Sequence, residues 1–285
     1  MRTVQIVKGN GDRESFDPDK LRQSLLRAHA TTIAAEAVVD AITKEIRAGM
    51  STGDIYRRAF TLLSSTEHSA ALTYSIRRSV LNLGPTGFPF ERYIAELLAE
   101  QGYKTRTGQH IQGRCIEHEV DVVAWNNEQL LFAEVKFHNE LTMKSDTKTA
   151  LYVKARFDDL YDHTHRIEGK ERTLTRGMLI TNTKFTQGAK EYASCVGTFD
   201  MISWDYPEHG NLYDMIAQTG LHPMTCLPSL SEHDKRELLK RGILHCKTLQ
   251  EDPSIMRSIG LPDTAIETVV RDVEQLRKPK RSHDL

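Results

Sequence analysis

Apolar residues recur three and four positions apart through the first third of the chain, which is the spacing of one face of an α-helix. Ahead of them, Val4 and Ile6 indicate a short strand followed by a turn at residues 9–12. Asp17 followed by Pro18 is typical of a helix start. Helices are expected over residues 17–28, 34–47, 51–63 and 67–81. This third is therefore predicted to be a helical bundle with a small N-terminal hairpin.

In the middle of the chain, the spacing of apolar residues changes between that of a helix and that of a strand. Helices are expected over residues 90–99, 143–161, 189–195 and 209–219, and strands over residues 115–125, 130–137, 178–181 and 199–202. Such alternation of helices and strands predicts a layered α/β domain with a mixed sheet.

Two clusters of helix-breaking residues divide the chain. The first is Gly84–Pro89 and the second is Pro223–Pro228. Beyond the second, Ser231 is a typical N-cap of a helix, and two further short helices follow it. We therefore expect three domains, over residues 1–85, 86–222 and 223–285, of which the last is all-helical.

The composition is that of an ordinary soluble globular protein, with 39% hydrophobic and 27% charged residues. No apolar run approaches the roughly 18 residues that a membrane-spanning helix needs. The N-terminal segment turns polar before the apolar core of a signal peptide forms, so a cytoplasmic protein is expected. The four cysteines are scattered, which favours free or buried thiols over a zinc site or disulfides.

The formal net charge is only −1, so attraction to nucleic acid must come from local clusters of positive charge. One candidate cluster lies at residues 144–156 and another at residues 277–281. Each of them reads equally well as an ordinary solvated face or tail.

Two neighbouring segments, HEVDVVAW and LLFAEVKF, alternate charged and apolar residues. In the first, Glu119 and Asp121 share one face of the strand, and in the second Glu134 and Lys136 do so. A hairpin centred in the intervening Asn-Asn-Glu-Gln turn pairs residues whose numbers sum to 255. Asp121 is then expected directly opposite Glu134.

Two opposed carboxylates destabilise a sheet unless a cation compensates them. Oxygen ligands from Asp121, Glu134 and the main-chain carbonyl of Val135 suit Mg²⁺ or Mn²⁺. Lys136 is then expected to orient or activate the water that attacks a phosphate. The alternative is a surface hairpin whose charges form an ordinary polar face.

The order FERYIAELLAEQGY, HEVDVVAW and AEVKFH resembles the PD-(D/E)xK nuclease superfamily. RGMLITNTKFTQGAKEYA followed by FDMISWD is similar to the continuation in Mrr-like type IV restriction endonucleases and archaeal Holliday-junction resolvases. The resemblance covers about residues 86–206, and Val120 stands where the family motif has its proline. It implies a metal-dependent DNA endonuclease with catalytic Asp121, Glu134 and Lys136.

The resemblance also implies a further acidic residue on the helix before the hairpin. Glu91 and Glu96 are the two candidates. Helical spacing puts Glu91 on the buried edge, whereas Glu96 aligns with Tyr93 and Glu100 on an outer face. Glu91 is therefore the expected catalytic residue, and its alternative role is that of a glutamate favoured by the helix dipole.

VQIVKGNGDRESFDPDKL and the later YSIRR resemble the opening and the close of an ATP-cone, over about residues 3–83. The resemblance implies that Lys8 and Lys20 bind the phosphates of ATP or dATP, with Arg77 or Arg78 as additions. Gly9 stands where the family usually has a second basic residue. No Walker-type phosphate loop occurs, which favours sensing over hydrolysis. The alternative is a helical interaction module that binds no nucleotide.

LSEHDKRELLKRGILHCKTL and IGLP resemble a helix-hairpin-helix or SAM-like module, which implies that the C-terminal segment binds either DNA or protein. The combined expectation is an endonuclease of host defence by restriction, controlled by a purine nucleotide and assembled as a homo-oligomer. A structure-selective repair nuclease is the first alternative. A non-enzymatic, nucleotide-sensing DNA-binding regulator is the second.

Overall fold

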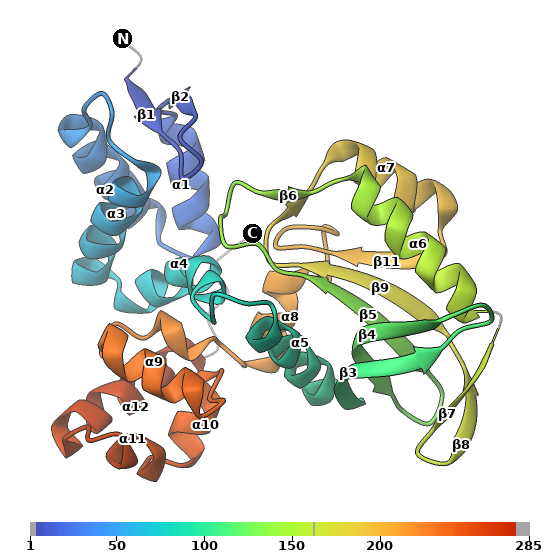
Figure 1. Ribbon diagram of the computed structural model, residues 1–285. Coiled ribbons are helices and arrows are strands. Elements are labelled where there is room, and N and C mark those ends of the chain that lie inside the picture. Colours follow the sequence, from blue (N-terminus) through green and yellow to red (C-terminus); the bar gives the residue numbers. More distant parts are fainter. Residues whose placement is uncertain (1–3, 162, 278–285) are drawn as a thin grey trace. The chain divides into compact units, whose positions relative to one another are not determined.

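The computed structural model describes residues 4–161 and 163–277, and Figure 1 shows its elements. The chain divides into two compact units. One combines Met1–Ser79 with His222–Leu285, and the other is Val80–Leu221. Each unit is described by itself below. The expected domain limits, 1–85, 86–222 and 223–285, remain a prediction. In the structure, segments from both ends of the chain share the first unit.

The N-terminal part of the first unit contains the hairpin and the four helices that the sequence predicts. Its strands β1 and β2 pair antiparallel, with Ile6 opposite Glu14. The elements are β1 (Gln5–Val7), β2 (Arg13–Ser15), α1 (Pro18–Arg27), α2 (Thr32–Glu45), α3 (Thr52–Thr66) and α4 (His68–Leu81). Asp17 caps α1 by accepting hydrogen bonds from two backbone amides, and Ser51 forms a capping box with Asp54 at α3.

The C-terminal part of the first unit is helical, as the sequence predicts, but three helices follow α9 where two short ones were expected, because the first of the two is divided near Pro253. Its elements are a 3₁₀ turn η1 (Met224–Cys226), α9 (Glu232–Lys240), α10 (Cys246–Glu251), α11 (Ser254–Ser258) and α12 (Asp263–Arg277). Ser231 caps α9 in a capping box with Asp234. All four cysteines of the chain are free thiols.

Helix α4 joins the two parts of this unit. Ala71 packs in the core formed by α1 to α3, whereas Leu72 packs in the C-terminal core. The Thr225 hydroxyl donates a hydrogen bond to the Ser79 carbonyl at 2.7 Å. A fragment that ends near residue 85 would expose the apolar face of α4 that packs against the C-terminal segment. The first unit therefore needs both of its segments to bury its hydrophobic surface.

The second unit is built on a five-stranded mixed sheet with the order β11-β9-β5-β4-β3. Strands β5, β9 and β11 run parallel, and β3, β4 and β5 pair antiparallel. The five strands are β3 (Lys104–Gln112), β4 (Glu117–Trp125), β5 (Leu130–Lys136), β9 (Arg176–Thr181) and β11 (Phe199–Ile202). The predicted α/β fold class with a mixed sheet is confirmed.

Helices cover the sheet as Figure 1 shows, with α5 packed on β3 and β4 and the pair α6 and α7 packed on β9 and β11. The remaining elements of the unit are α5 (Phe88–Glu100), β6 (Lys144–Ser145), α6 (Thr147–Tyr161), β7 (Thr164–Ile167), β8 (Lys170–Thr173), β10 (Lys184–Phe185), α7 (Gln187–Val196) and α8 (Leu212–Thr219). Phe132 of β5 and Phe157 of α6 lie in one hydrophobic core. This packing holds β4 and β5 between two layers of helices.

Strand β3 and the hairpin β7–β8 were absent from the sequence expectation. In β3, exposed and half-buried residues alternate without a buried apolar position. It is an edge strand, paired with β4 alone. An edge strand of this kind carries too few apolar residues to show the period of two on which strand prediction depends.

Within the described ranges, residues 4–161 and 163–277, no helix is long and apolar enough to cross a membrane.

Candidate functional site

The hairpin formed by β4 and β5 has the register that the sequence predicts. Val122 pairs with Ala133 and Trp125 pairs with Leu130, so the numbers of opposite residues sum to 255. The ladder ends at the Val122–Ala133 pair. Asp121 therefore lies one position beyond the last backbone pair, where the two strands separate.

The side chain of Asp121 continues the connection between the two strands. Its Oδ2 accepts a hydrogen bond from the backbone N–H of Val135 at 2.6 Å. On the other side of β4, the pairing with β3 skips Asp121 and Gly108, and Gly108 adopts a left-handed φ of 58°. The strict alternation expected from the sequence also slips here, because Val120 and Val123 pack in the same core.

Glu134 is a buried carboxylate held by two cations. Its Oε1 lies 3.1 Å from Lys136 Nζ, and its Oε2 accepts a hydrogen bond from Arg156 Nη1. The Glu134 side chain is 8% exposed, whereas that of Lys136 is 41% exposed. A buried carboxylate of this kind requires compensating charge. Lys136 adds to that charge from a position that solvent and a substrate can reach.

The environment of Asp121 disfavours its negative charge. Burial, and then the neighbouring Glu134 carboxylate, raise the pKa of Asp121 to about 7. Glu91 adds repulsion, while Lys136 and the Val135 amide act in the opposite direction. The four candidate residues from the sequence therefore lie close enough for their charges to affect the pKa of Asp121. They are Asp121 itself, Glu134, Glu91 and Lys136.

Of the two acidic candidates on α5, Glu91 is the one that interacts electrostatically with the charged residues of this site. Burial raises the pKa of Glu91, and the carboxylates of Glu119 and Glu134 raise it further. Burial also raises the pKa of Glu96, but the charge that acts on it is that of Arg92. The outer face expected for Glu96 is wrong, because Tyr93 is fully buried and Glu96 itself is half-buried, with its Oε2 enclosed.

Oxygen atoms are the available metal donors at this site. Among the described residues, no three His, Cys, Asp or Glu side chains gather as a metal-binding group. Asp121 and Glu134 nevertheless form a pair of repelling carboxylates. Burial and then the Glu134 charge raise the pKa of Asp121, so a cation placed beside it would stabilise the ionised carboxylate. This donor set fits a hard divalent cation such as Mg²⁺ or Mn²⁺.

The end of β5 is fixed by a residue that sequence reasoning did not assign to the site. Asn182, which follows β9 and is 1% exposed, accepts a hydrogen bond from the His138 backbone N–H and donates one to the His138 carbonyl, both at 2.8 Å. These bonds extend the β5–β9 pairing beyond Lys136 and Thr181. An asparagine directly after a short apolar strand pattern was the signal available in the sequence.

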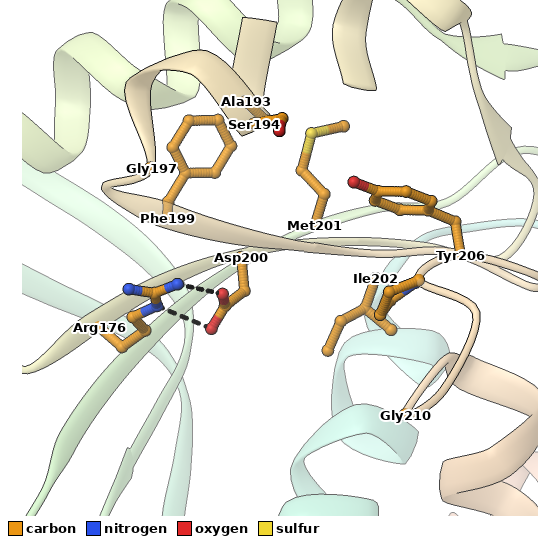
Figure 2. A pocket seen from close by; sticks show the side chains of 11 residues that line it. Arg176, Ala193, Ser194, Gly197, Phe199, Asp200, Met201, Ile202, Tyr206 and Gly210 are labelled. Carbon is orange, nitrogen blue, oxygen red and sulfur yellow. Dashed lines mark hydrogen bonds and ion pairs between the residues drawn. The ribbon is translucent and has the colours of Figure 1, made fainter. Parts of the chain in front are cut away.

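A cavity of about 370 Å³ lies beside β11 in the same unit. Figure 2 shows Phe199, Met201 and Tyr206 on its wall, with Arg176 and Asp200 joined by two hydrogen bonds at 2.9 and 2.5 Å. The candidate catalytic residues do not line this cavity. The candidate nuclease site is instead the place where β4 and β5 separate.

The two lysines expected to bind nucleotide lie together in the first unit. Lys8 Nζ is 2.8 Å from Glu14 Oε2, and Lys20 Nζ is 3.8 Å from the same oxygen. Residues from the loop after β1, from β2 and from α1 thus converge. The Glu14 carboxylate lies between the two ammonium groups. A phosphate group would have to compete with this carboxylate for the same position.

Arg78 lies beside the start of α3. A Cβ atom on Gly53 would lie 3.6 Å from Arg78 Nη2, and the Arg78 guanidinium sits 4.4 Å from the centre of the Tyr56 ring. Val7, next to Lys8, donates its backbone N–H to the Met50 carbonyl at 3.0 Å, so β1 runs beside the same helix start. Arg77 points about 100° away from Arg78 around α4.

Three known domains match the chain. An ATP cone domain matches residues 4–80, a restriction endonuclease domain matches residues 85–207, and an AF1548-like C-terminal domain matches residues 222–277. An uncharacterized protein of Archaeoglobus fulgidus is 33% identical over 184 residues, which are 64% of this chain and 99% of that protein. The sequence-based recognition of an ATP cone domain followed by a restriction endonuclease domain is confirmed. The helix-hairpin-helix or SAM-like character of the C-terminal segment remains a prediction.

Two solved structures are similar to the chain. The crystal structure of AF1548, a protein of unknown function, has a TM-score of 0.52 and 31% identity, and covers 67% of this chain and 98% of that one. The MspJI restriction endonuclease in complex with a 27-mer oligonucleotide has a TM-score of 0.36 and 14% identity, and covers 61% of this chain and 36% of that one.

Proposed function

Because the chain belongs to the AF1548 family and contains a restriction endonuclease domain, we propose that it is a divalent-metal-dependent DNA endonuclease. The observation that carries the proposal is the convergence of Asp121, Glu134 and Lys136 where the β4–β5 ladder ends. Asp121 bonds to the Val135 amide, and Glu134 pairs with Lys136. A mere polar hairpin does not account for a buried carboxylate beside an aspartate with a pKa of about 7.

The residues divide the chemistry among them. Asp121, Glu134 and the Val135 carbonyl would hold the cation, which would supply Lewis acidity to polarise the scissile phosphate and to acidify bound water. Lys136 orients the attacking water and offsets the negative charge that develops on the phosphate. Glu91 contributes a further acidic group to the cluster.

A cleavage assay tests this proposal. Plasmid DNA, with and without base modification, is incubated with the full chain and Mg²⁺ or Mn²⁺, and the loss of supercoiled DNA is followed. Cleavage is expected with either cation and is expected to stop with a chelator. Comparison of linear with branched DNA separates a role in restriction from one in repair. If no DNA is cut with either cation, the nuclease proposal is wrong and a DNA-binding regulator takes its place.

The ATP cone domain leads to a second proposal, that ATP or dATP binds at Lys8, Lys20 and Arg78 and controls assembly or cleavage without being hydrolysed. The convergence of Lys8 and Lys20 at one carboxylate supports it. Control of this kind requires that nucleotide bind two states of the protein unequally. A shift between monomer and homo-oligomer is the simplest pair of such states.

Titration calorimetry tests nucleotide binding. The full chain is used, since α4 packs against the C-terminal segment and a shorter fragment would lose this packing. Lys8→Ala and Lys20→Ala are each expected to weaken binding about 10-fold, the loss of one charged hydrogen bond. Glu14→Gln should strengthen binding, since it removes the competing carboxylate. Lys44→Ala, an exposed lysine on α2, is the matched control. Equal affinities across the set would refute this assignment.

A further inference from the structure

Arg156 of α6 connects the two strands of the candidate nuclease site. Its Nη1 donates to Glu134 Oε2, and its Nη2 donates to the Glu119 carbonyl. The Arg156 side chain is 15% exposed. Together with Val120 and Phe157, Arg156 and Glu134 line a small internal cavity between the sheet and α6. Most of the Arg156 side chain is thus buried.

This connection lies where the strands have no backbone pairing of their own. The β4–β5 ladder stops at Val122 and Ala133. Beyond that pair, Asp121 accepts from the Val135 amide, and Arg156 reaches from Glu134 on β5 to the carbonyl of Glu119 on β4. Arg156 therefore sets both the conformation of Glu134 and its distance from β4.

The two cations on Glu134 differ in how firmly they are held. Lys136 is the more exposed of the two and contacts Oε1 at 3.1 Å. Arg156 has two acceptors, and its guanidinium lies 5.6 Å from the centre of the Tyr152 ring. A planar guanidinium with two acceptors keeps its geometry better than a single ammonium does. Oε1 is consequently the oxygen that an incoming ion can share, while Arg156 retains Oε2.

We propose that Arg156 is a positioning residue, which holds Glu134 through Oε2 so that Oε1 stays available to the divalent cation beside Asp121. The proposal rests on the nuclease function proposed above. In this proposal, Arg156 acts by positioning Glu134 and does not contact DNA. Arg156 therefore matters for cation binding even in the absence of substrate.

The test uses the full chain with Arg156→Gln, Arg156→Lys, Glu134→Gln and the double variant Arg156→Gln/Glu134→Gln. Mn²⁺ is titrated into each while the melting temperature is recorded. Arg156→Gln should raise the half-saturating Mn²⁺ concentration about 10- to 100-fold, the usual effect of losing a residue that orients a metal ligand. Arg156→Lys, which keeps the charge but loses the second acceptor, should give a smaller increase.

Lys154→Gln is the matched control. Lys154 lies on the same helix, its side chain is 18% exposed, and it pairs with Asp158. Its removal should leave the Mn²⁺ titration unchanged. In the double variant, loss of Arg156 should add little to the effect of Glu134→Gln, because both changes remove the same interaction.

Additive effects of the two substitutions, or an unchanged Mn²⁺ titration of Arg156→Gln, would overturn the proposal and leave Arg156 as an ordinary structural cation. The melting titration is independent of cleavage. A wild-type chain that responds to Mn²⁺ but cuts no DNA would contradict the nuclease function while still allowing Arg156 to be judged. Where cleavage is measurable, Arg156→Gln should regain rate at high Mn²⁺, which a general folding defect would not do.

Discussion

Replacing Lys136 by alanine is expected to reduce the rate of DNA cleavage by roughly 100- to 1000-fold, the usual loss when one group that stabilises transition-state charge is removed. DNA binding should change little, because the Lys136 ammonium acts on the attacking water and on charge that develops only during the reaction. The measurements are single-turnover cleavage of plasmid DNA and equilibrium binding of a labelled duplex. Asp121→Ala should cause a similar loss of rate.

Lys184→Ala provides the matched control for this experiment. The Lys184 side chain is also 41% exposed and pairs with a carboxylate, Asp205, in the same unit. It lies on β10, outside the candidate site. Its loss should leave the cleavage rate unchanged. If Lys136→Ala cuts DNA as fast as Lys184→Ala, the charged hairpin is an ordinary polar face.

Asp121→Asn is expected to stabilise the metal-free protein at pH 8. The pKa of Asp121 is raised to about 7 in the folded protein, whereas that of an unfolded aspartate is about 3.9. The stabilising contribution of this group is therefore fully present below pH 4 and is lost as the pH rises to 7. The loss amounts to at most about 4 kcal/mol, since one pKa unit corresponds to about 1.4 kcal/mol.

Thermal melting between pH 4 and pH 8 measures this effect. Asp121→Asn should match the wild type near pH 4 and melt at a higher temperature at pH 8. Mg²⁺ should raise the melting temperature of the wild type at pH 8 and have little effect on the variant, because the cation compensates the carboxylate. Asp158→Asn, which removes an exposed carboxylate of the same unit, controls for net charge. A variant less stable than the wild type at pH 8 would contradict the proposed repulsion.

The sequence was sufficient for the local parts of the candidate site. The β4–β5 register followed from alternation and from the position of the turn, since a hairpin pairs residues whose numbers have a constant sum. The caps at Asp17 and Ser231 followed in the same way from short-range chemistry. Such features depend on residues within a few positions of one another, and the chain itself records them.

Tertiary structure decided the features that depend on distant residues. Arg156 lies 22 positions from Glu134, and its side chain reaches that carboxylate only because α6 packs on the sheet. From the sequence, Arg156 was one member of the basic cluster at residues 144–156, a candidate for attraction to nucleic acid. The slip of alternation at Asp121 was equally hidden, because it arises from pairing with β3, whose polar residues carry no strand signal.

The amino-acid sequence by itself determined the order of the elements, the hairpin register and the residue types of the candidate site, because these depend on local spacing. Folding decided which charges meet. The burial of Asp121 and the charge of Glu91, which both raise the pKa of Asp121, depend on packing between segments far apart in the chain, and so does the guanidinium that holds Glu134. Electrostatic interactions act through space and strengthen with burial, so they appear only once the layers have packed.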